Sequence, residues 1–261
     1  MVKAIFFDID GTILSHTISD IPQNTLKTLD RLREKGILLF VATGRHLSEM
    51  RRLPLHDYPF DAYVTQTGQL CYDQNFKAIY KEPLSKEDTE VLVRHFNEKK
   101  IPLVLLNEEE LYMNYVDETV ISTQISINTA VPQIGTYKGE ELYGATVFGK
   151  GAILEQLMNE LKGCKESSWH KNASDIILKS SGKVKGIEEI LKHFDLKREE
   201  TMAFGDADND LEMLDYAAIG VAMGNGTDRL KSIADYVTAS VDDDGITKAL
   251  IHYGIIDEEE G

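Results

Sequence analysis

Both ends of the chain alternate short apolar runs with segments of helical periodicity. Near the start, "KAIFFDI" precedes a helical segment over 22–35, and "ILLFVATG" and "AYVTQTG" follow it. Near the end, a helical segment over 184–194 precedes "TMAFGDA", and "IGVAMG" follows another over 209–217. Short β-branched or aromatic runs separated by helices are typical of a parallel α/β sheet. We therefore expect an α/β domain to which both ends of the chain contribute.

The residues between these two halves follow a different pattern. Helical segments over 86–99 and 153–162 are mixed with strand-like runs such as "IPLVLL", "YGATVFG" and "SDIILK". Such a mixture is typical of an α+β domain. The sequence thus predicts a discontinuous α/β domain over 1–82 and 183–261, with an α+β domain inserted over 83–182.

The composition excludes several classes of partner. The chain has 261 residues, 42% of them hydrophobic, which is enough for a packed core. Its formal net charge of −16 repels the phosphates of nucleic acids and anionic lipids. We expect neither a nucleic acid nor a membrane as partner, and nothing in the chain indicates an obligate protein partner. Any phosphate-binding patch must be local.

Cysteine spacing and hydropathy favour a cytoplasmic protein. Cys71 and Cys164 lie far apart and outside any metal-ligand spacing, so neither a zinc site nor a disulfide framework is indicated. The opening "MVKAIFF" is too short for a signal peptide, and no apolar run approaches the ~18 residues of a membrane span.

Two carboxylates end the first apolar run, in "FFDIDGT". Asp8 and Asp10 fall where a parallel sheet binds ligands, beyond the carboxyl end of a strand. Gly11 allows a sharp turn, and two acids so close together repel each other unless a cation or a shared proton relieves them. A pair of acids alone could also be a helix cap and a turn residue. The pair nevertheless suggests a divalent metal ion.

Two further stretches carry groups that suit an anion. "VATGR" ends the second strand with the Thr43 hydroxyl, the Gly44 backbone N–H and the Arg45 guanidinium. "GKVKG" places Lys183 and Lys185 just before a helix, where either ammonium could bridge a carboxylate and a phosphate. The residues alone leave the choice between the two lysines open.

A third stretch, "GDADND", gathers three acids and an amide after another apolar strand. As a helix start it would use Asp208 or Asn209 as a cap. Acids packed after a buried strand also supply oxygen ligands to a hard cation such as Mg²⁺. The three acids of this stretch, Asp206, Asp208 and Asp210, are therefore candidates for a metal site.

Taken in order, DxDGT, TGR, KG and GDxxND resemble the motifs of the haloacid dehalogenase (HAD)-like superfamily of phosphatases. "IGVAMGNG" and "ADYVTASVDDDGITKAL" resemble the Cof-type branch of sugar-phosphate phosphatases. The large insertion follows Thr43 rather than Asp8, which is the placement that the superfamily calls a C2 cap, and its mixed content resembles the C2B form. The resemblance implies a Rossmann-like core and hydrolysis of a small phosphorylated metabolite, with sugar phosphates as the first choice.

The resemblance also implies roles for the quoted residues. Asp8 would be the nucleophile that forms an aspartyl-phosphate, and Asp10 would be the general acid and base, held in place by Thr12. Mg²⁺ would be bound by the side chains of Asp8 and Asp206 and by the backbone carbonyl of Asp10.

For the phosphoryl group, the resemblance implies Thr43, Gly44, Lys185 and Asn209 as ligands. Lys185 is preferred to Lys183 because the family lysine directly precedes the glycine.

Three residues keep two interpretations. Asp210 would orient Lys185 or a metal-bound water, while Arg45 either touches the substrate or pairs with an acid of the core. Asp175, on a strand of the inserted domain, either faces the active site or is solvated.

Two other functions compete with a phosphatase. A phosphomannomutase-like enzyme shares the C2B cap but moves phosphate within a sugar bisphosphate. A phospho-accepting receiver module also combines acids, Mg²⁺, a threonine and a lysine on a parallel sheet, although it would be about half as long and would lack an insertion.

Overall fold

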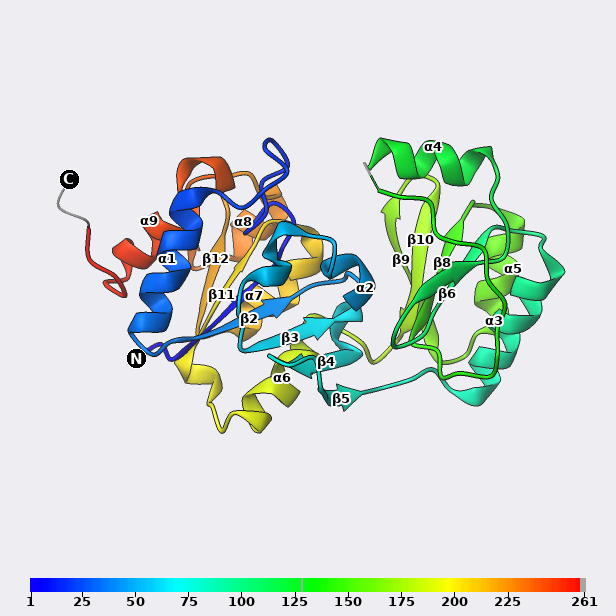
Figure 1. The fold of residues 1–261 in the computed structure, drawn as a ribbon, viewed down its shortest axis with the longest axis horizontal. Coiled ribbons are helices and arrows are strands. Elements are labelled where there is room, and N and C mark those ends of the chain that lie inside the picture. Colours follow the sequence, from blue (N-terminus) through cyan, green and yellow to red (C-terminus); the bar gives the residue numbers. More distant parts are fainter. Residues whose placement is uncertain (128, 259–261) are drawn as a thin grey trace. The chain divides into compact units, whose positions relative to one another are not determined.

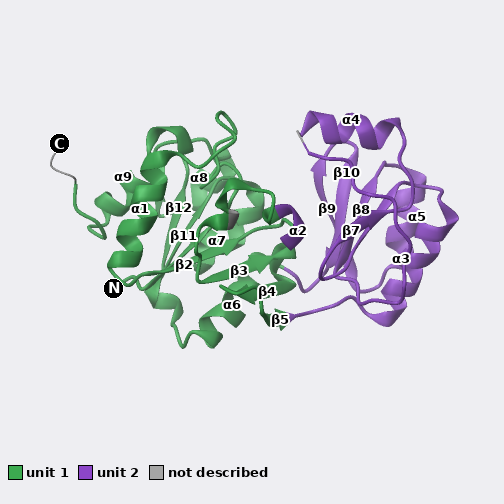
Figure 2. Cartoon of the chain, in the orientation of Figure 1, with its two compact units in different colours: residues 1–45, 50–80, 182–261 green, residues 46–49, 81–181 purple. Residues whose placement is uncertain are grey.

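The computed structural model describes residues 1–127 and 129–258. They form two compact units (Figure 2). Unit 1 holds 1–45, 50–80 and 182–261, and unit 2 holds 46–49 and 81–181. The predicted insertion, 83–182, overlaps most of unit 2, but the short segment 46–49 is far from it in sequence. Each unit has its own sheet and its own apolar core.

Unit 1 is built on an eight-stranded sheet (Figure 1). Its strands from β13 to β3 are parallel, and β4 runs antiparallel to β3. This arrangement confirms the predicted α/β class. In sheet order the strands are β13 (Tyr236–Val237), β12 (Ile219–Ala222), β11 (Thr201–Gly205), β1 (Ala4–Phe7), β2 (Leu38–Ala42), β3 (Ala62–Thr65), β4 (Leu70–Asp73) and β5 (Ala78–Lys81).

Helices and short 3-10 turns connect these strands. The helices are α1 (Gln23–Glu34), α2 (Leu47–Met50), α6 (Lys183–His193), α7 (Leu211–Tyr216), α8 (Asp228–Ile233) and α9 (Gly245–His252). The 3-10 turns are η1 (Pro54–Asp57), η2 (Gln66–Gly68), η3 (Arg198–Glu200), η4 (Asp208–Asp210) and η5 (Val241–Asp243). No helix in the described part of the chain combines the length and the hydropathy needed for a bilayer crossing.

Strand alternation explains how unit 1 buries its sheet. Phe6 in β1 belongs to an apolar cluster with Ile187 and Ile190 of α6, so even-numbered positions of β1 face that helix. Ile5 and Phe7, which point the other way, are equally buried. Both faces of the sheet are therefore covered, which is typical of parallel sheets.

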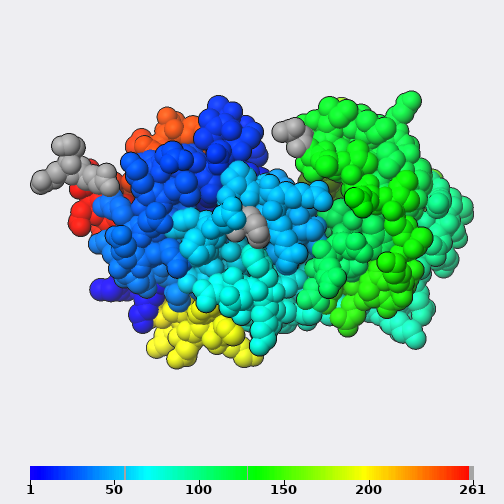
Figure 3. All heavy atoms as spheres, in the orientation of Figure 1, coloured from blue at the N-terminus to red at the C-terminus, as the bar shows by residue number. Residues whose placement is uncertain are grey.

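The two ends of the chain lie together in unit 1. Thr28 of α1 shares a 2.7 Å hydrogen bond with Thr247 of α9. In Figure 3 the first residues (blue) and the last helices (orange and red) form one continuous surface. Unit 1 is thus closed by contacts between residues that are far apart in sequence.

Unit 2 contains a five-stranded sheet in which each described pairing is antiparallel. Its strands in sheet order are β7 (Leu111–Met113), β6 (Leu103–Leu106), β8 (Gly144–Phe148), β10 (Ala173–Leu178) and β9 (Cys164–His170). Leu92 of α3 (Lys86–Glu98) and Leu157 of α5 (Ala152–Glu160) join the apolar cluster on this sheet. The predicted α+β character of the insertion is confirmed.

One helix of unit 2, α4 (Glu118–Ser126), is not indicated by the sequence pattern. Its run of β-branched residues favours a strand by local propensity. The helix forms because the Asp117 side chain accepts a hydrogen bond from the N–H of Val120, and because Val120 is buried against the sheet.

Helix α6 approaches the sheet of unit 1 unusually closely at Gly186. A Cβ atom on this residue would lie 2.4 Å from Cγ1 of Val64 and 3.0 Å from Cα of Gly68. Gly68 itself has a φ of +89°, and a Cβ there would lie 2.1 Å from the carbonyl oxygen of Gly182. These glycines let the first turn of α6 sit directly on β3 and on the turn that follows it.

We expect Gly186→Ala to lower the free energy of unfolding by about 1–3 kcal/mol, because the methyl group forces α6 off the sheet. Helix propensity alone predicts the opposite sign, a gain of about 1 kcal/mol. Urea denaturation measures the difference. Glu188→Ala, on an exposed position of the same helix, is the control and should change stability by less than about 0.5 kcal/mol. A stabilised Gly186→Ala protein would contradict the close packing.

Candidate active site

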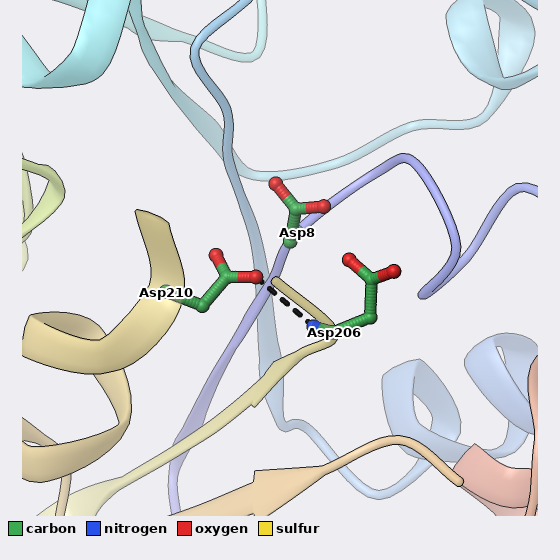
Figure 4. Close-up of side chains that lie close together, drawn as sticks. All are labelled: Asp8, Asp206 and Asp210. Carbon is green, nitrogen blue, oxygen red and sulfur yellow. Dashed lines mark hydrogen bonds between the residues drawn. The ribbon is translucent and has the colours of Figure 1, made fainter. Parts of the chain in front are cut away.

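Three acids meet at the carboxyl edge of the sheet in unit 1. Asp8 follows β1, and Asp206 follows β11, its parallel neighbour. Asp210 lies at the end of η4, four residues further along the chain. Each acid offers an oxygen that lies within 4.8 Å of the others. Figure 4 shows the three side chains close together. Such a set of carboxylate oxygens suits a hard divalent cation.

A buried ammonium group links two of these acids. The Nζ atom of Lys183 lies 2.5 Å from Oδ1 of Asp8 and 2.5 Å from Oδ1 of Asp210, and Lys183 is only 2% exposed. Burial by itself would lower the pKa of Lys183, but the charges of Asp210 and Asp8 outweigh it and raise that pKa. The lysine is therefore held as a cation beside Asp8.

Asp210 uses both carboxylate oxygens to hold its neighbours. Its Oδ1 contacts Lys183, while its Oδ2 accepts hydrogen bonds from the N–H groups of Asp206, at 3.0 Å, and Ala207, at 3.1 Å. The dashed line in Figure 4 marks the bond to Asp206. Asp210 thus positions the lysine and the start of the loop that carries Asp206.

The site has more negative than positive charge. Burial, followed by the influence of neighbouring charges, raises the pKa of Asp8 to about 8 even though Lys183 acts in the opposite direction. Burial, with Asp210 as the next cause, raises the pKa of Asp206 to about 7. One ammonium does not balance three carboxylates, so the donor set fits a bound divalent cation.

Lys185, the lysine that the resemblance prefers, does not lie in this cluster, whereas Lys183 does. The Nζ atom of Lys185 lies 3.5 Å from Oε1 of Glu189 and 5.5 Å from the ring centre of Tyr80. The reason is helical phase. Lys183 precedes Gly186 by three residues and shares its face of α6, whereas Lys185, the immediate neighbour of that glycine, points elsewhere.

Asp10 pairs with Arg45 rather than with Lys183. The guanidinium donates from Nε to Oδ2 at 2.6 Å and from its NH2 group to Oδ1 at 2.8 Å. The side chain of Arg45 is 28% exposed and that of Asp10 is 31% exposed. In the structure the Arg45 guanidinium thus pairs with an acid, which is the second of the two interpretations given for this residue.

The loop after β2 is braced by the turn after β3. Thr43 is buried, and its Oγ1 accepts the N–H of Arg45 at 3.1 Å. The carbonyl oxygens of Thr43 and Arg45 accept the N–H groups of Thr67 and Gln66. Gly44 is exposed beside them. The buried Thr43 and exposed Gly44 are compatible with an anion-binding loop.

The turn after β3 has an unusual backbone. Gln66 and Thr67 have φ values of +49° and +52°, which is uncommon for residues that carry a side chain, and Gly68 continues in the same region. Nothing in their residue types indicates this conformation. Backbone strain of this kind concentrates at functional sites.

Asn225 is a site residue that the sequence analysis missed. Its Nδ2 donates to the carbonyl oxygen of Gly11 at 2.8 Å, and its Oδ1 accepts the N–H of Val241 at 2.9 Å. Gly11 has a φ of +77°, and a Cβ atom there would lie 2.2 Å from Oδ2 of Asp206. The glycine after the acid pair is therefore required by turn geometry and by the nearby carboxylate.

Thr12 and Asn209 are the remaining predicted site residues of unit 1. Thr12 is buried, but among the described atoms its hydroxyl has no hydrogen-bond partner, so the structure lacks the expected contact with Asp10. Asn209 is exposed on η4.

Asp175 lies in unit 2, on β10. It is half-buried there, and its Oδ1 accepts a hydrogen bond from Oγ1 of Thr146 at 2.7 Å. Burial is the main cause that raises the pKa of Asp175 to about 6. The side chain is thus held on the sheet rather than fully solvated.

Comparisons with known proteins show the family to which this chain is related. Residues 5–250 match the family model of haloacid dehalogenase-like hydrolases. The Bacillus subtilis (strain 168) protein YkrA, provisionally named a phosphatase, is 32% identical over 257 residues, which are 97% of this chain and 98% of YkrA. In the same organism, the 5-amino-6-(5-phospho-D-ribitylamino)uracil phosphatase YitU is 28% identical over 264 residues, covering 95% and 96% of the two chains.

A solved structure agrees with these sequence relatives. The structure of a HAD subclass IIB sugar phosphatase superimposes with a TM-score of 0.81 at 34% identity, covering 98% of this chain and all of the other. The matches span both units of the chain as well as the acid cluster. The chain belongs to the haloacid dehalogenase-like hydrolase family.

Proposed function

We propose that the chain is a Mg²⁺-dependent phosphomonoesterase that acts on small phosphorylated metabolites through an aspartyl-phosphate on Asp8. The observation that carries this proposal is the buried Lys183, whose ammonium lies between Asp8 and Asp210 next to Asp206. A carboxylate that attacks a phosphoryl dianion needs positive charge around it, and this arrangement supplies part of that charge.

The relatives support phosphate-ester hydrolysis as the class of reaction. YitU is named for a phosphorylated ribityl compound, and the subclass IIB structure is that of a sugar phosphatase. Both substrates are phosphate monoesters of polyhydroxylated molecules. Sugar phosphates and related polyol phosphates are therefore the first substrates to test.

The donor set fits one Mg²⁺ ion. We assign the carboxylates of Asp8 and Asp206 and the backbone carbonyl of Asp10 as its ligands. When bound, the ion supplies positive charge that offsets the repulsion between a carboxylate and a phosphoryl dianion. Asp210 is not assigned as a ligand because Lys183 and two backbone N–H groups already occupy its oxygens.

Two carboxylates of the chain divide the chemistry. In the first step an oxygen of Asp8 attacks phosphorus, the bond from phosphorus to the alcohol oxygen breaks, and Asp10 gives its proton to that oxygen. In the second step Asp10 takes a proton from a water molecule that attacks phosphorus. Inorganic phosphate then leaves, and the Asp8 carboxylate is restored.

Other groups bind the phosphoryl oxygens and the leaving alcohol. We assign the Lys183 ammonium, the Thr43 hydroxyl and the Gly44 N–H to the phosphoryl oxygens, where charge spreads in the transition state. Asn209 stays a prediction as a further phosphate ligand. Asp175, in unit 2, stays a prediction as a residue that faces the substrate.

We expect the wild type to release inorganic phosphate from members of a panel of sugar phosphates, nucleotides, pyridoxal phosphate and 4-nitrophenyl phosphate. EDTA should abolish the activity and Mg²⁺ should restore it. Asp8→Asn should lower kcat by at least about 1000-fold because the amide is not a nucleophile. The matched control is Asp208→Asn, an exposed acid that contacts Thr227 and Arg229 instead.

Two other outcomes would contradict the proposed hydrolase and favour one of the two competing functions. Isomerised sugar phosphates without release of inorganic phosphate would indicate a mutase. A stable phosphoryl group on Asp8 without turnover would indicate a receiver-like module.

Lys183→Met and Lys185→Met separate the two lysines. We expect Lys183→Met to lower kcat/KM by about 100- to 1000-fold, because it removes a cation aimed at the reacting group. Lys185→Met should change kcat/KM by less than about 3-fold, since a partly exposed pair with Glu189 contributes little. Steady-state phosphate release measures both, with circular dichroism as a check of folding. A larger loss in Lys185→Met would contradict the assignment of Lys183.

A further inference from the structure

Two consecutive residues, Arg45 and His46, are held by different units. The Arg45 guanidinium bonds to Asp10, and both residues belong to unit 1. The Nε2 atom of the His46 ring lies 2.8 Å from the carbonyl oxygen of Asn107, and both residues belong to unit 2. The peptide bond between Arg45 and His46 therefore joins two anchored residues. Arg45 contacts Asp10, the proposed general acid and base, and His46 contacts Asn107 inside unit 2.

The contact between Arg45 and Asp10 has a geometry that fixes orientation. The guanidinium engages both oxygens of the carboxylate, which sets the plane and the rotamer of the Asp10 side chain. Because both side chains are partly exposed, the pair contributes little to stability. Its main effect is thus geometric.

The backbone of Arg45 is itself held firmly. Its N–H donates to Oγ1 of Thr43, and its carbonyl oxygen accepts the N–H of Gln66. These bonds tie it to the loops that follow β2 and β3. The side chain is therefore presented to Asp10 from a fixed base.

The segment that follows is fixed just as firmly, but in unit 2. His46 is 1% exposed, and its Nδ1 lies 2.7 Å from Oγ of Ser48. Its N–H donates to Oε2 of Glu49 at 3.0 Å. Residues 46–49 thus form a short bonded segment anchored at Asn107, which explains why they group with unit 2.

We propose that Arg45 is a positioning residue for Asp10, and that His46 ties this positioning to unit 2. The inference rests on the proposed function, in which Asp10 gives a proton to the leaving alcohol. A general acid must lie within hydrogen-bond reach of the oxygen that it protonates, and small displacements cost much of its effect. The Arg45 guanidinium keeps the Asp10 carboxylate in one orientation for that transfer.

The leaving group distinguishes this role from direct binding of the phosphoryl group. An alkoxide is a poor leaving group and needs the proton, whereas 4-nitrophenolate leaves without one. Because kcat/KM covers only the steps up to release of the alcohol, the later hydrolysis of the aspartyl-phosphate does not enter it. Misplacing Asp10 must therefore lower kcat/KM for an alkyl phosphate far more than for 4-nitrophenyl phosphate.

The experiment measures kcat/KM for 4-nitrophenyl phosphate and for the alkyl phosphate that the wild type hydrolyses best. Arg45→Gln should lower the alkyl value about 10- to 100-fold and the aryl value less than about 3-fold. Arg45→Lys, which keeps the charge but not the two-point contact, should fall between. Arg51→Gln is the matched control, since that exposed guanidinium stacks on Phe76 and should leave both values unchanged.

Two further variants test whether Arg45 acts through Asp10 and whether His46 contributes to the position of Arg45. In an Asp10→Asn background, Arg45→Gln should change neither value more than about 3-fold, because the group that it positions is gone. His46→Phe keeps a planar ring of somewhat larger size and removes both ring nitrogens. It should lower the alkyl value selectively, by about 3- to 10-fold, if the anchor in unit 2 contributes to the position of Arg45.

The outcomes separate this inference from the proposed function. Equal losses on both substrates, together with weaker inhibition by inorganic phosphate, would show that Arg45 binds the phosphoryl group and would overturn the inference alone. If His46→Phe leaves the ratio of the alkyl to the aryl kcat/KM unchanged, the link to unit 2 is overturned. A wild type that releases phosphate from neither substrate would overturn the proposed function and this inference with it.

Discussion

The ammonium of Lys183, buried between Asp8 and Asp210, is the interaction on which the site depends. Two carboxylates this close would repel each other without it, and a lysine this deeply buried would lose its proton without them. The pairing also links three segments that are distant in sequence: β1, the start of α6 and the turn after β11. The contact that places positive charge beside the proposed nucleophile therefore also holds the carboxyl edge of the sheet together.

Several close backbone approaches make this contact possible. Gly186 and Gly68 let α6 lie on β3, which brings the first residue of that helix to the strand ends. Gly11 lets the loop after Asp8 pass directly beside the Asp206 carboxylate. At both places a larger residue would displace a charged group, and electrostatic stabilisation in a site of low dielectric depends strongly on such distances.

The sequence predicted the class of fold because alternation of apolar runs and helices is a local pattern that survives folding. It also predicted Asp8 and Asp206 as neighbours, since parallel strands bring their carboxyl ends to one edge. It left the choice between Lys183 and Lys185 open, because residues adjacent in sequence face different sides of a helix and the pattern does not say which side meets the acids. It could not indicate the left-handed Gln66 and Thr67, the role of Asn225 or the place of 46–49 in unit 2. Each of these depends on contacts with residues far away in the chain.

The position of β1 within its sheet has a consequence for how the protein is made. This strand lies in the middle of the sheet, between β2 and β11, although it comes first among the strands of the sheet in the sequence and β11 comes close to the end. Until residues 201–205 are synthesised, one edge of β1 has no neighbour and its apolar side chains lack part of their cover. Unpaired strand edges promote association with other chains. The inserted unit, whose strands are all contiguous within 103–178, has no such delay and can fold while the sheet that surrounds it in sequence is still incomplete.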